Sequence, residues 1–305
     1  MPAPFGDSHP VPITKVPNPF IQWLVFWCLA GAWGCSFLFI KIGVTYIGPL
    51  TLVSGRFLIG LVGTLLLVSN RRAVLPGSLR RWGQLLFLGT FNLALPIFLI
   101  SWGEQSIDSS MAAVLNATVP IWAVSIAHFA LPDERLTAAK VAGIAIGFIG
   151  VVVLVGLPAA AQSSFWGQLA VVVAAVSYAF GSIYVRRYLR GVPHNQIIVV
   201  TLISALLITG TATLIVEGLP TAGVHPNALM AMLWLGLVAT ALSYKLYYRL
   251  LDWWGAGRST TVTYVFPVVG VILGIIFLDE GLTIRFILGG MLILLGVTTA
   301  NRKPA

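Results

Sequence analysis

The stretch from Gly257 to Thr283, GRSTTVTYVFPVVGVILGIIFLDEGLT, decides the fold, because the chain carries a second version of it. The second version runs from Asp108 to Thr137, DSSMAAVLNATVPIWAVSIAHFALPDERLT. In both, a proline sits within an apolar run of helix length, and an acidic pair and a Leu-Thr follow. Pro120 and Pro267 are 147 positions apart, whereas the acidic pairs are 146 apart. The chain therefore contains an internal repeat.

The repeat extends in both directions from these prolines. Ala94 to Trp102, ALPIFLISW, aligns with Ala241 to Arg249, ALSYKLYYR. Further matches at offsets of 145 to 147 are Gly89 with Gly236, Gly143 with Gly289, Gly150 with Gly296, Trp33 with Tyr178 and Lys41 with Arg186. The duplication thus covers nearly the whole chain after Val16.

The composition is that of a membrane protein. Apolar residues make up 58% of the chain and charged residues 9%, whereas a soluble domain carries about 25% charged residues. A helix needs about 20 apolar residues to cross the hydrocarbon core. The sequence predicts an all-α integral membrane protein with ten transmembrane helices, at about 20–42, 48–69, 82–104, 108–130, 137–157, 165–187, 195–217, 227–250, 257–278 and 283–301.

Five spans in each half force the second half to enter the membrane from the opposite side, so we expect inverted repeats. The expected halves are 20–157 and 165–301, and the proline-rich segment 1–19 is expected to be a disordered cytoplasmic tail. Inverted repeats recur in secondary transporters, where the binding site lies near the midplane between the halves.

The net charge of +9 is explained by the membrane topology, because the basic residues gather in the loops of one side. Sorted by alternate loops, fifteen of the eighteen Lys and Arg residues fall on one side of the membrane. By the positive-inside rule, this side and both termini are cytoplasmic. We therefore expect a multi-pass protein of the cell (inner) membrane, whose partners are the lipid bilayer and a small-molecule metabolite. Nucleic acid is not an expected partner.

Three features together resemble the EamA-type family of the drug/metabolite transporter superfamily. They are the segment AWGCSFLFIK (Ala32 to Lys41), the Arg56-Phe57-Leu58 of the second span, and the twin Pro, acidic-pair and Leu-Thr patterns. The resemblance implies an inner-membrane exporter of amino acids or other small metabolites, with a central cavity between the two halves. The second half has no Arg equivalent to Arg56, so any role of that residue belongs to one half.

Arg56 lies near the centre of its span, where an isolated charge costs from a few to more than ten kcal/mol. Such a charge must face a cavity or protein partners. It either anchors a substrate carboxylate or is a structural residue bound to backbone carbonyls.

The proline helices suggest a second set of site residues. A proline frees the carbonyl four residues earlier and bends the helix. That position is Asn116 before Pro120 and Thr263 before Pro267. The two polar faces would flank the cavity, with Pro120 and Pro267 as gating bends. Alternatively, Asn116 and Thr263 join neighbouring helices by hydrogen bonds.

Polar and aromatic residues near mid-span complete the expected cavity lining: Trp33, Asn92, Tyr178, Tyr244 and Tyr264. A tyrosine offers an apolar wall with a polar tip, which suits an amphiphilic metabolite. Ordinary core packing would explain each of them as well.

The chain lacks the motifs of several other functions. The sequence has no phosphate-binding GxxxxGK[ST] loop, no HExxH, CxxC or GxSxG element and no metal-ligand spacing. We therefore expect no catalytic residue, no bound metal and no cofactor, and we expect that the protein is not an enzyme. All nine acidic residues fall in the tail, in loops or at span ends, which excludes a proton relay through a midplane carboxylate. Transport would be downhill, exchange, or coupled through His128, Lys245 or an end-of-span acid.

The leading hypothesis is a ten-span secondary transporter that exports amino acids or similar metabolites by alternating access. A lipid or isoprenoid-carrier flippase, with a lateral opening and a charged headgroup groove, and a membrane-embedded enzyme are the alternatives. The glycine pairs Gly143 with Gly147 and Gly270 with Gly274 favour packing inside one chain, and so a monomer.

Overall fold

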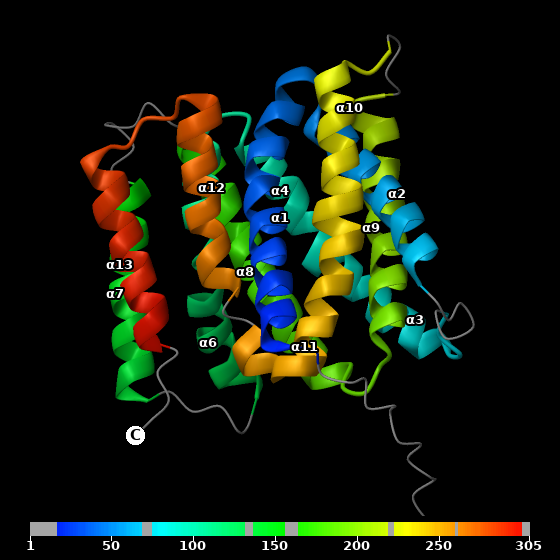
Figure 1. Cartoon of the computed structure of the whole chain (residues 1–305), viewed down its shortest axis with the longest axis horizontal. Coiled ribbons are helices and arrows are strands. Elements are labelled where there is room, and N and C mark those ends of the chain that lie inside the picture. The colour runs from blue at the N-terminus through cyan, green and yellow to red at the C-terminus, as the bar shows by residue number, and fades with distance from the viewer. Residues whose placement is uncertain are drawn as a thin grey trace, which may run out of the picture.

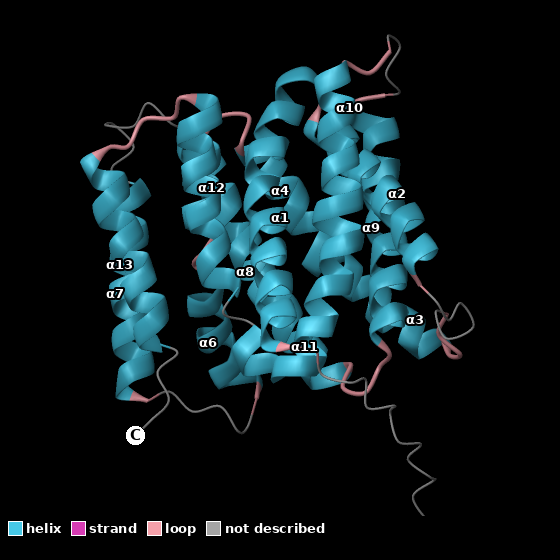
Figure 2. Cartoon of the chain, in the orientation of Figure 1, coloured by secondary structure: helices cyan, strands magenta, loops and turns pink. Residues whose placement is uncertain are grey.

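The structure is a computed structural model that describes residues 17–68, 75–131, 137–155, 164–218, 223–259 and 262–300. Over these residues every regular element is a helix and none is a strand (Figure 2). In chain order they are α1 (Pro19–Tyr46), α2 (Pro49–Leu67), α3 (Leu79–Gly89), the π-helix η2 (Thr90–Ala94), α4 (Leu95–Gly103), α5 (Ser109–Asn116), α6 (Val119–Ala130), α7 (Ala138–Val155), α8 (Phe165–Tyr188), α9 (His194–Val216), α10 (Pro226–Leu233), the π-helix η4 (Trp234–Leu242), α11 (Ser243–Ser259), α12 (Val262–Leu278) and α13 (Ile284–Ala300).

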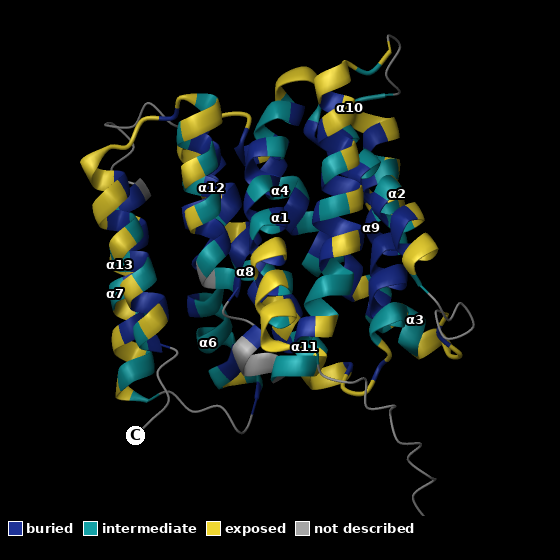
Figure 3. Ribbon diagram, in the orientation of Figure 1, coloured by how far each residue is buried: buried dark blue, intermediate teal, exposed yellow. Residues whose placement is uncertain are grey.

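The helices form the ten expected spans. Seven helical stretches in the described residues are long and apolar enough to cross a bilayer, and three of these combine several helices: Leu79–Gly103, Ser109–Ala130 and Pro226–Trp254. Three shorter apolar helices, Ala138–Leu154, Val265–Leu278 and Ile284–Ala300, complete the ten. Large apolar side chains such as Leu66 and Phe129 are exposed, as contact with lipid requires. Exposed stretches recur along the helices of the bundle, drawn in yellow in Figure 3.

The two halves are inverted, as predicted. α1 begins and α13 ends at the same end of the bundle, at the bottom of Figure 1. We call this the Pro19 end and the opposite end, where α1 finishes, the Tyr46 end. Because successive spans cross in alternate directions, the first span of the second half, α8, runs opposite to α1.

The twofold relation between the halves extends to single contacts. Equivalent spans lie against each other in three pairs: α2 with α9, the α5–α6 span, through α5, with α12, and α7 with α13. A Cβ on Gly89 would lie 2.6 Å from the carbonyl oxygen of Thr201, and one on Gly236 would lie 3.0 Å from that of Arg56. Arg56 and Thr201 are equivalent at the offset of 145, as the two glycines are at 147. The repeat in the sequence is therefore a repeat of backbone contacts.

The α7–α13 pair is held by backbone contact at glycines. A Cβ on Gly296 of α13 would lie 2.6 Å from the carbonyl oxygen of Gly143 on α7, and a Cβ on Gly150 would lie 2.9 Å from that of Gly289. Side chains at these positions would force the two helices apart. The predicted internal use of Gly143 and Gly147 is seen here, and Gly270 likewise packs internally, against Ala113 of α5.

Replacing Gly296 by alanine is expected to destabilise the protein by about 1–3 kcal/mol, the usual cost of an overpacked core. The added methyl would meet the backbone of Gly143 and Gly147. Gly290→Ala on the same helix is the matched control, because its Cβ would meet only Val114 Cγ1, at 3.7 Å. Thermal unfolding in detergent compares the two, and equal melting temperatures would contradict the packing argument.

Candidate functional site

Arg56 lies in the middle of α2 and is 7% exposed. Its Nε donates a hydrogen bond to Thr240 Oγ1 at 3.1 Å, and this hydroxyl donates to the carbonyl oxygen of Leu235 at 2.8 Å. Thr240 belongs to η4, where the widened turn changes which carbonyls are paired along the helix. The π-helix thus supplies the acceptor that holds the guanidinium in place.

The described structure provides no carboxylate partner for Arg56. The titratable groups that act on it electrostatically are Tyr178 and Tyr244. The described carboxylates belong to the ends of spans: Glu104, Asp108, Glu217, Asp279 and Glu280 at the Tyr46 end and Asp252 near the Pro19 end. A guanidinium has five N–H donors, and Thr240 accepts from only one of them. Arg56 is therefore a buried cation with donors left for an anionic ligand.

Tyr178 of α8 and Tyr244 of α11 flank this cation. Both are half-buried and pack against the same apolar cluster, which includes Val53 and Phe57 of α2. Tyr178 also packs against the largest buried apolar cluster among the described residues. The structure thus brings together three of the residues that the sequence analysis selected, one from each of three spans.

Trp33 belongs to a neighbouring aromatic group. Its ring lies 5.5 Å from that of Tyr247 on α11 and 6.5 Å, edge to face, from that of Phe266 on α12. Phe266 in turn stacks with Phe37 at 6.0 Å. Trp33 therefore joins α1 to two helices of the second half.

The two proline helices differ. At Pro120 the span breaks, since α5 ends at Asn116 and α6 starts at Val119, whereas Pro267 lies inside the continuous helix α12. The side-chain oxygen of Asn116 is buried and has no hydrogen-bond partner in the described structure. Thr263 is half-buried in the first turn of α12. The side chain of Tyr264 lies outside the described residues.

Asn92 packs elsewhere. It lies on η2 against Gly181 of α8, where a Cβ would come within 2.8 Å of Asn92 Cγ. Gly181 is three residues after Tyr178 on the same helix. Asn92 thus lies beside the wall that carries Tyr178, and its described contact is with that backbone.

The sequence analysis missed the two π-helices. η2 and η4 are equivalent, because residues 90–94 of the first half correspond to 237–241 of the second at the offset of 147. The available signal was the alignment of ALPIFLISW with ALSYKLYYR, which begin five residues after Gly89 and Gly236. This alignment marks equivalent segments but carries no sign of helix type. Thr240 was missed for the same reason.

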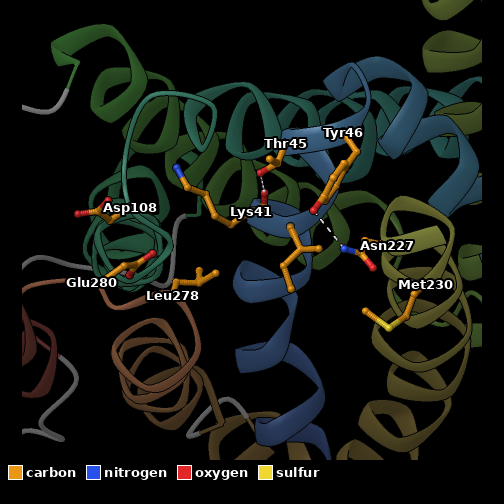
Figure 4. A pocket seen from close by; sticks show the side chains of 9 residues that line it. Lys41, Thr45, Tyr46, Asp108, Asn227, Met230, Leu278 and Glu280 are labelled. Atoms are coloured by element: carbon orange, nitrogen blue, oxygen red, sulfur yellow. Dashed lines mark hydrogen bonds between the residues drawn. The ribbon is translucent and has the colours of Figure 1, made fainter. Parts of the chain in front are cut away.

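A second polar site lies at the Tyr46 end (Figure 4). A cavity of about 380 Å³ there is lined by Lys41, Asp108, Asn227 and Glu280, among others. Lys41 Nζ donates to the carbonyl oxygens of Glu104 at 2.7 Å and Ile107 at 2.8 Å. Burial raises the pKa of Asp108, and the negative charge of Glu280 raises it further.

Two carboxylates at this end bind helix N-termini of the other half. Glu280, just after α12, accepts from the backbone N–H groups of Ser109 and Ser110 at 2.7 and 2.9 Å. Glu217, after α9, accepts from those of Leu50 and Thr51 at 2.9 and 2.8 Å. Helix N-termini favour anions. The Glu280 contact therefore joins α5 to the end of α12, and the Glu217 contact joins α2 to the end of α9.

Comparison with known proteins places these features in a family context. The family model described as "EamA-like transporter family" matches residues 21–156 and 165–302. An uncharacterized transporter of Archaeoglobus fulgidus is 29% identical over 92% of this chain and 99% of its own length. A probable amino-acid metabolite efflux pump of Salmonella typhimurium is 27% identical, covering 87% of this chain and 89% of that protein.

Further relatives agree with this picture. The uncharacterized inner membrane transporter YedA of Escherichia coli K12 is 28% identical over 79% of this chain and 78% of its own length. A solved structure described only as "Crystal structure of protein" superposes with a TM-score of 0.65 over 93% of this chain and 98% of that one, at 20% identity. At that identity the match shows the fold alone.

Replacing Thr240 by valine removes the acceptor of Arg56 Nε and is expected to destabilise the protein by about 1.5–3 kcal/mol, as for other hydrogen bonds to charged groups. Thr240→Ser keeps the hydroxyl and serves as the control. Thermal unfolding of both variants measures the difference. Equal stability of the two would show that the hydroxyl does not hold the guanidinium.

Proposed function

Because the chain belongs to the EamA-like transporter family, we propose that this multi-pass membrane protein is a secondary transporter that exports amino acids or similar small amphiphilic metabolites. Substrate would bind between the two inverted halves and leave by alternating access. The halves would be 20–157 and 165–301. Two relatives, from Salmonella typhimurium and Escherichia coli K12, carry the name probable amino-acid metabolite efflux pump.

The observation that carries the proposal is the buried charge of Arg56 without a carboxylate among the described residues. A buried charge is stable only when it is paired or hydrogen-bonded. Here one donor is used by Thr240, and a substrate carboxylate would use the terminal amino groups as a bidentate partner. The Thr240 contact would fix the guanidinium before the substrate arrives.

The aromatic side chains around Arg56 support an amphiphilic substrate. Tyr178 and Tyr244 lie close enough to interact with the guanidinium and also pack on the apolar cluster of α2. Their rings would cover the apolar part of a bound amino acid and their hydroxyls its polar part. Trp33, Asn92, Asn116, Thr263 and Tyr264 complete the proposed lining.

We place the Pro19 end in the cytoplasm and the Tyr46 end outside it. Of the described Lys and Arg residues, those at the Tyr46 end are Lys41 and Arg285, whereas the Pro19 end carries Arg80, Arg81, Lys140, Arg186, Arg187, Arg190, Lys245 and Arg249. This asymmetry follows the positive-inside rule. With the relatives' inner-membrane name, it supports a monomeric inner-membrane exporter with both termini in the cytoplasm.

The break at Pro120 gives the proposed movement a place to act. α5 and α6 meet there without continuous helical hydrogen bonds. A hinge between short helices absorbs rotation at low cost. Pro267, inside α12, would bend less, so the two proposed gates would differ in stiffness.

A flippase is the second candidate, because an apolar groove of about 230 Å³ lies between α5, α12 and α13. Its lining includes Pro267, Phe286 and Met291, and every lining side chain is apolar. A headgroup would need charged partners in such a groove. The export of a soluble metabolite is therefore the better-supported proposal, and we propose no catalytic activity.

Replacing Arg56 by leucine is expected to reduce efflux of carboxylate-bearing amino acids by about tenfold or more, since a lost charged hydrogen bond is worth about 1.5–3 kcal/mol. Transport of cationic analogues without a carboxylate should fall less. Efflux from loaded proteoliposomes, with a panel of both classes, measures this ratio. Arg56→Lys keeps the positive charge but loses the two parallel N–H donors of the guanidinium, so its efflux should lie between those of the wild type and of Arg56→Leu. Equal loss for both classes together with poor folding would assign Arg56 a structural role.

Replacing Asn116 or Thr263 by alanine is expected to lower efflux without lowering the amount of folded protein. The reason is that both side chains belong to the polar faces proposed to flank the cavity. Efflux per folded transporter, quantified after size-exclusion chromatography, is the measurement. Unchanged efflux in both variants would remove these faces from the proposed site.

A further inference from the structure

Glu104 is buried in a way that the transport proposal does not use. It follows α4 in the 104–108 turn at the Tyr46 end and is 0% exposed. Both of its carboxylate oxygens are buried without a hydrogen-bond partner in the described structure. An ionised carboxylate in such a place loses its hydration without compensation. The neutral, protonated form is the one this environment stabilises.

The charged groups around Glu104 come from three elements. Lys41 approaches from α1 and Glu280 from the segment after α12, while Asp108 ends the same turn. Two further helices pack on α4: α8 has no titratable residue over 165–177, and α2 has none over 49–55. Burial raises the pKa of Glu104 well above its ordinary value, with Lys41 acting in the opposite direction and Glu280 in the same one.

Lys41 is engaged with backbone rather than with these carboxylates. Its ammonium donates to the carbonyl oxygens of Glu104 and Ile107, the first and fourth residues of the 104–108 turn. The turn leads directly into α5, whose first N–H groups are held by Glu280. α1, this turn, α5 and the end of α12 are thus tied together at the Tyr46 end, beside the buried carboxyl group of Glu104.

We propose that Glu104 is a proton-binding site through which the pH on the Tyr46 side controls the opening of that end, and that Lys41 is the group that responds to its ionisation. The inference rests on the proposed transport function. When Glu104 releases its proton to water in the adjoining cavity, the new carboxylate attracts the Lys41 ammonium. Lys41 then leaves the two carbonyls, and the turn before α5 loses its anchor. Proton binding from the same side restores the contacts and closes the Tyr46 end, so the pH on that side gates export and no proton crosses the membrane.

The test uses full-length protein in proteoliposomes with a labelled amino acid that the wild type exports. Glutamine is neutral like protonated glutamic acid. Glu104→Gln is therefore expected to favour the closed form of the Tyr46 end and to lose the stimulation of efflux that the wild type shows when the pH on the Tyr46 side is raised. Asp279→Asn is the matched control, since Asp279 is an exposed carboxylate at the same end whose φ of 53° an asparagine tolerates. It should keep the stimulation. Full stimulation in Glu104→Gln would overturn the proposal.

A second measurement needs no substrate and separates the two proposals. Infrared titration of the purified wild type should show the band of a protonated carboxyl group at neutral pH, lost only as the pH rises. The band should persist in Asp108→Asn. Its absence from the wild type would overturn the Glu104 site even if amino acids are exported. Its presence in a protein that exports no amino acid would overturn the proposed substrate and keep the proton site. This readout also decides the matter if Glu104→Gln does not fold.

Discussion

The interior of a bilayer offers no hydrogen bonds, so each polar group within a span must find its partner inside the protein. Most do so here. Ser204 donates across to the carbonyl oxygen of Leu86 at 2.7 Å, and Ser243 donates to that of Val238, five residues earlier, at 2.8 Å. The π-helical turns leave carbonyls that hydroxyls can reach. Asn116, with its unpartnered oxygen, and Arg56, with its unused donors, are among the groups within the described spans whose hydrogen bonds are incomplete, and both belong to the proposed cavity.

The ten spans and the inverted halves could be predicted because both follow from local properties of the sequence, namely apolar length and a fixed offset. The π-helices and the burial of Glu104 could not, since they depend on how distant segments pack. The prolines show the limit of the repeat argument. Thr118 donates to the carbonyl oxygen of Leu115 at 2.7 Å and accepts from Trp122 at 3.1 Å, which satisfies the broken turn before Pro120. Its equivalent in the second half is Val265, which has no hydroxyl, and there the helix continues.

Comparing equivalent positions of the two halves also separates the residues that form the framework from those that form the proposed binding site. The glycine contacts of Gly89 and Gly236 are equivalent in the two halves. The charged Arg56, in contrast, is replaced by an uncharged threonine, Thr201, at the equivalent position of the second half. Thr201 bonds to carbonyls of its own helix. The acceptor Thr240 likewise corresponds to Leu93. Duplication thus explains the framework, and the differences between the halves explain why an anion site would form on one side of the axis only.

The glycine contact between α7 and α13 has a consequence for the origin of the fold. Each of these helices is the last of its half, and each presents to the other a face of glycines that lets the two backbones come into contact. A protein of five spans would therefore already carry the surface on which an oppositely inserted copy could dock. Gene fusion would then only have made permanent an antiparallel pairing that two separate chains were able to form.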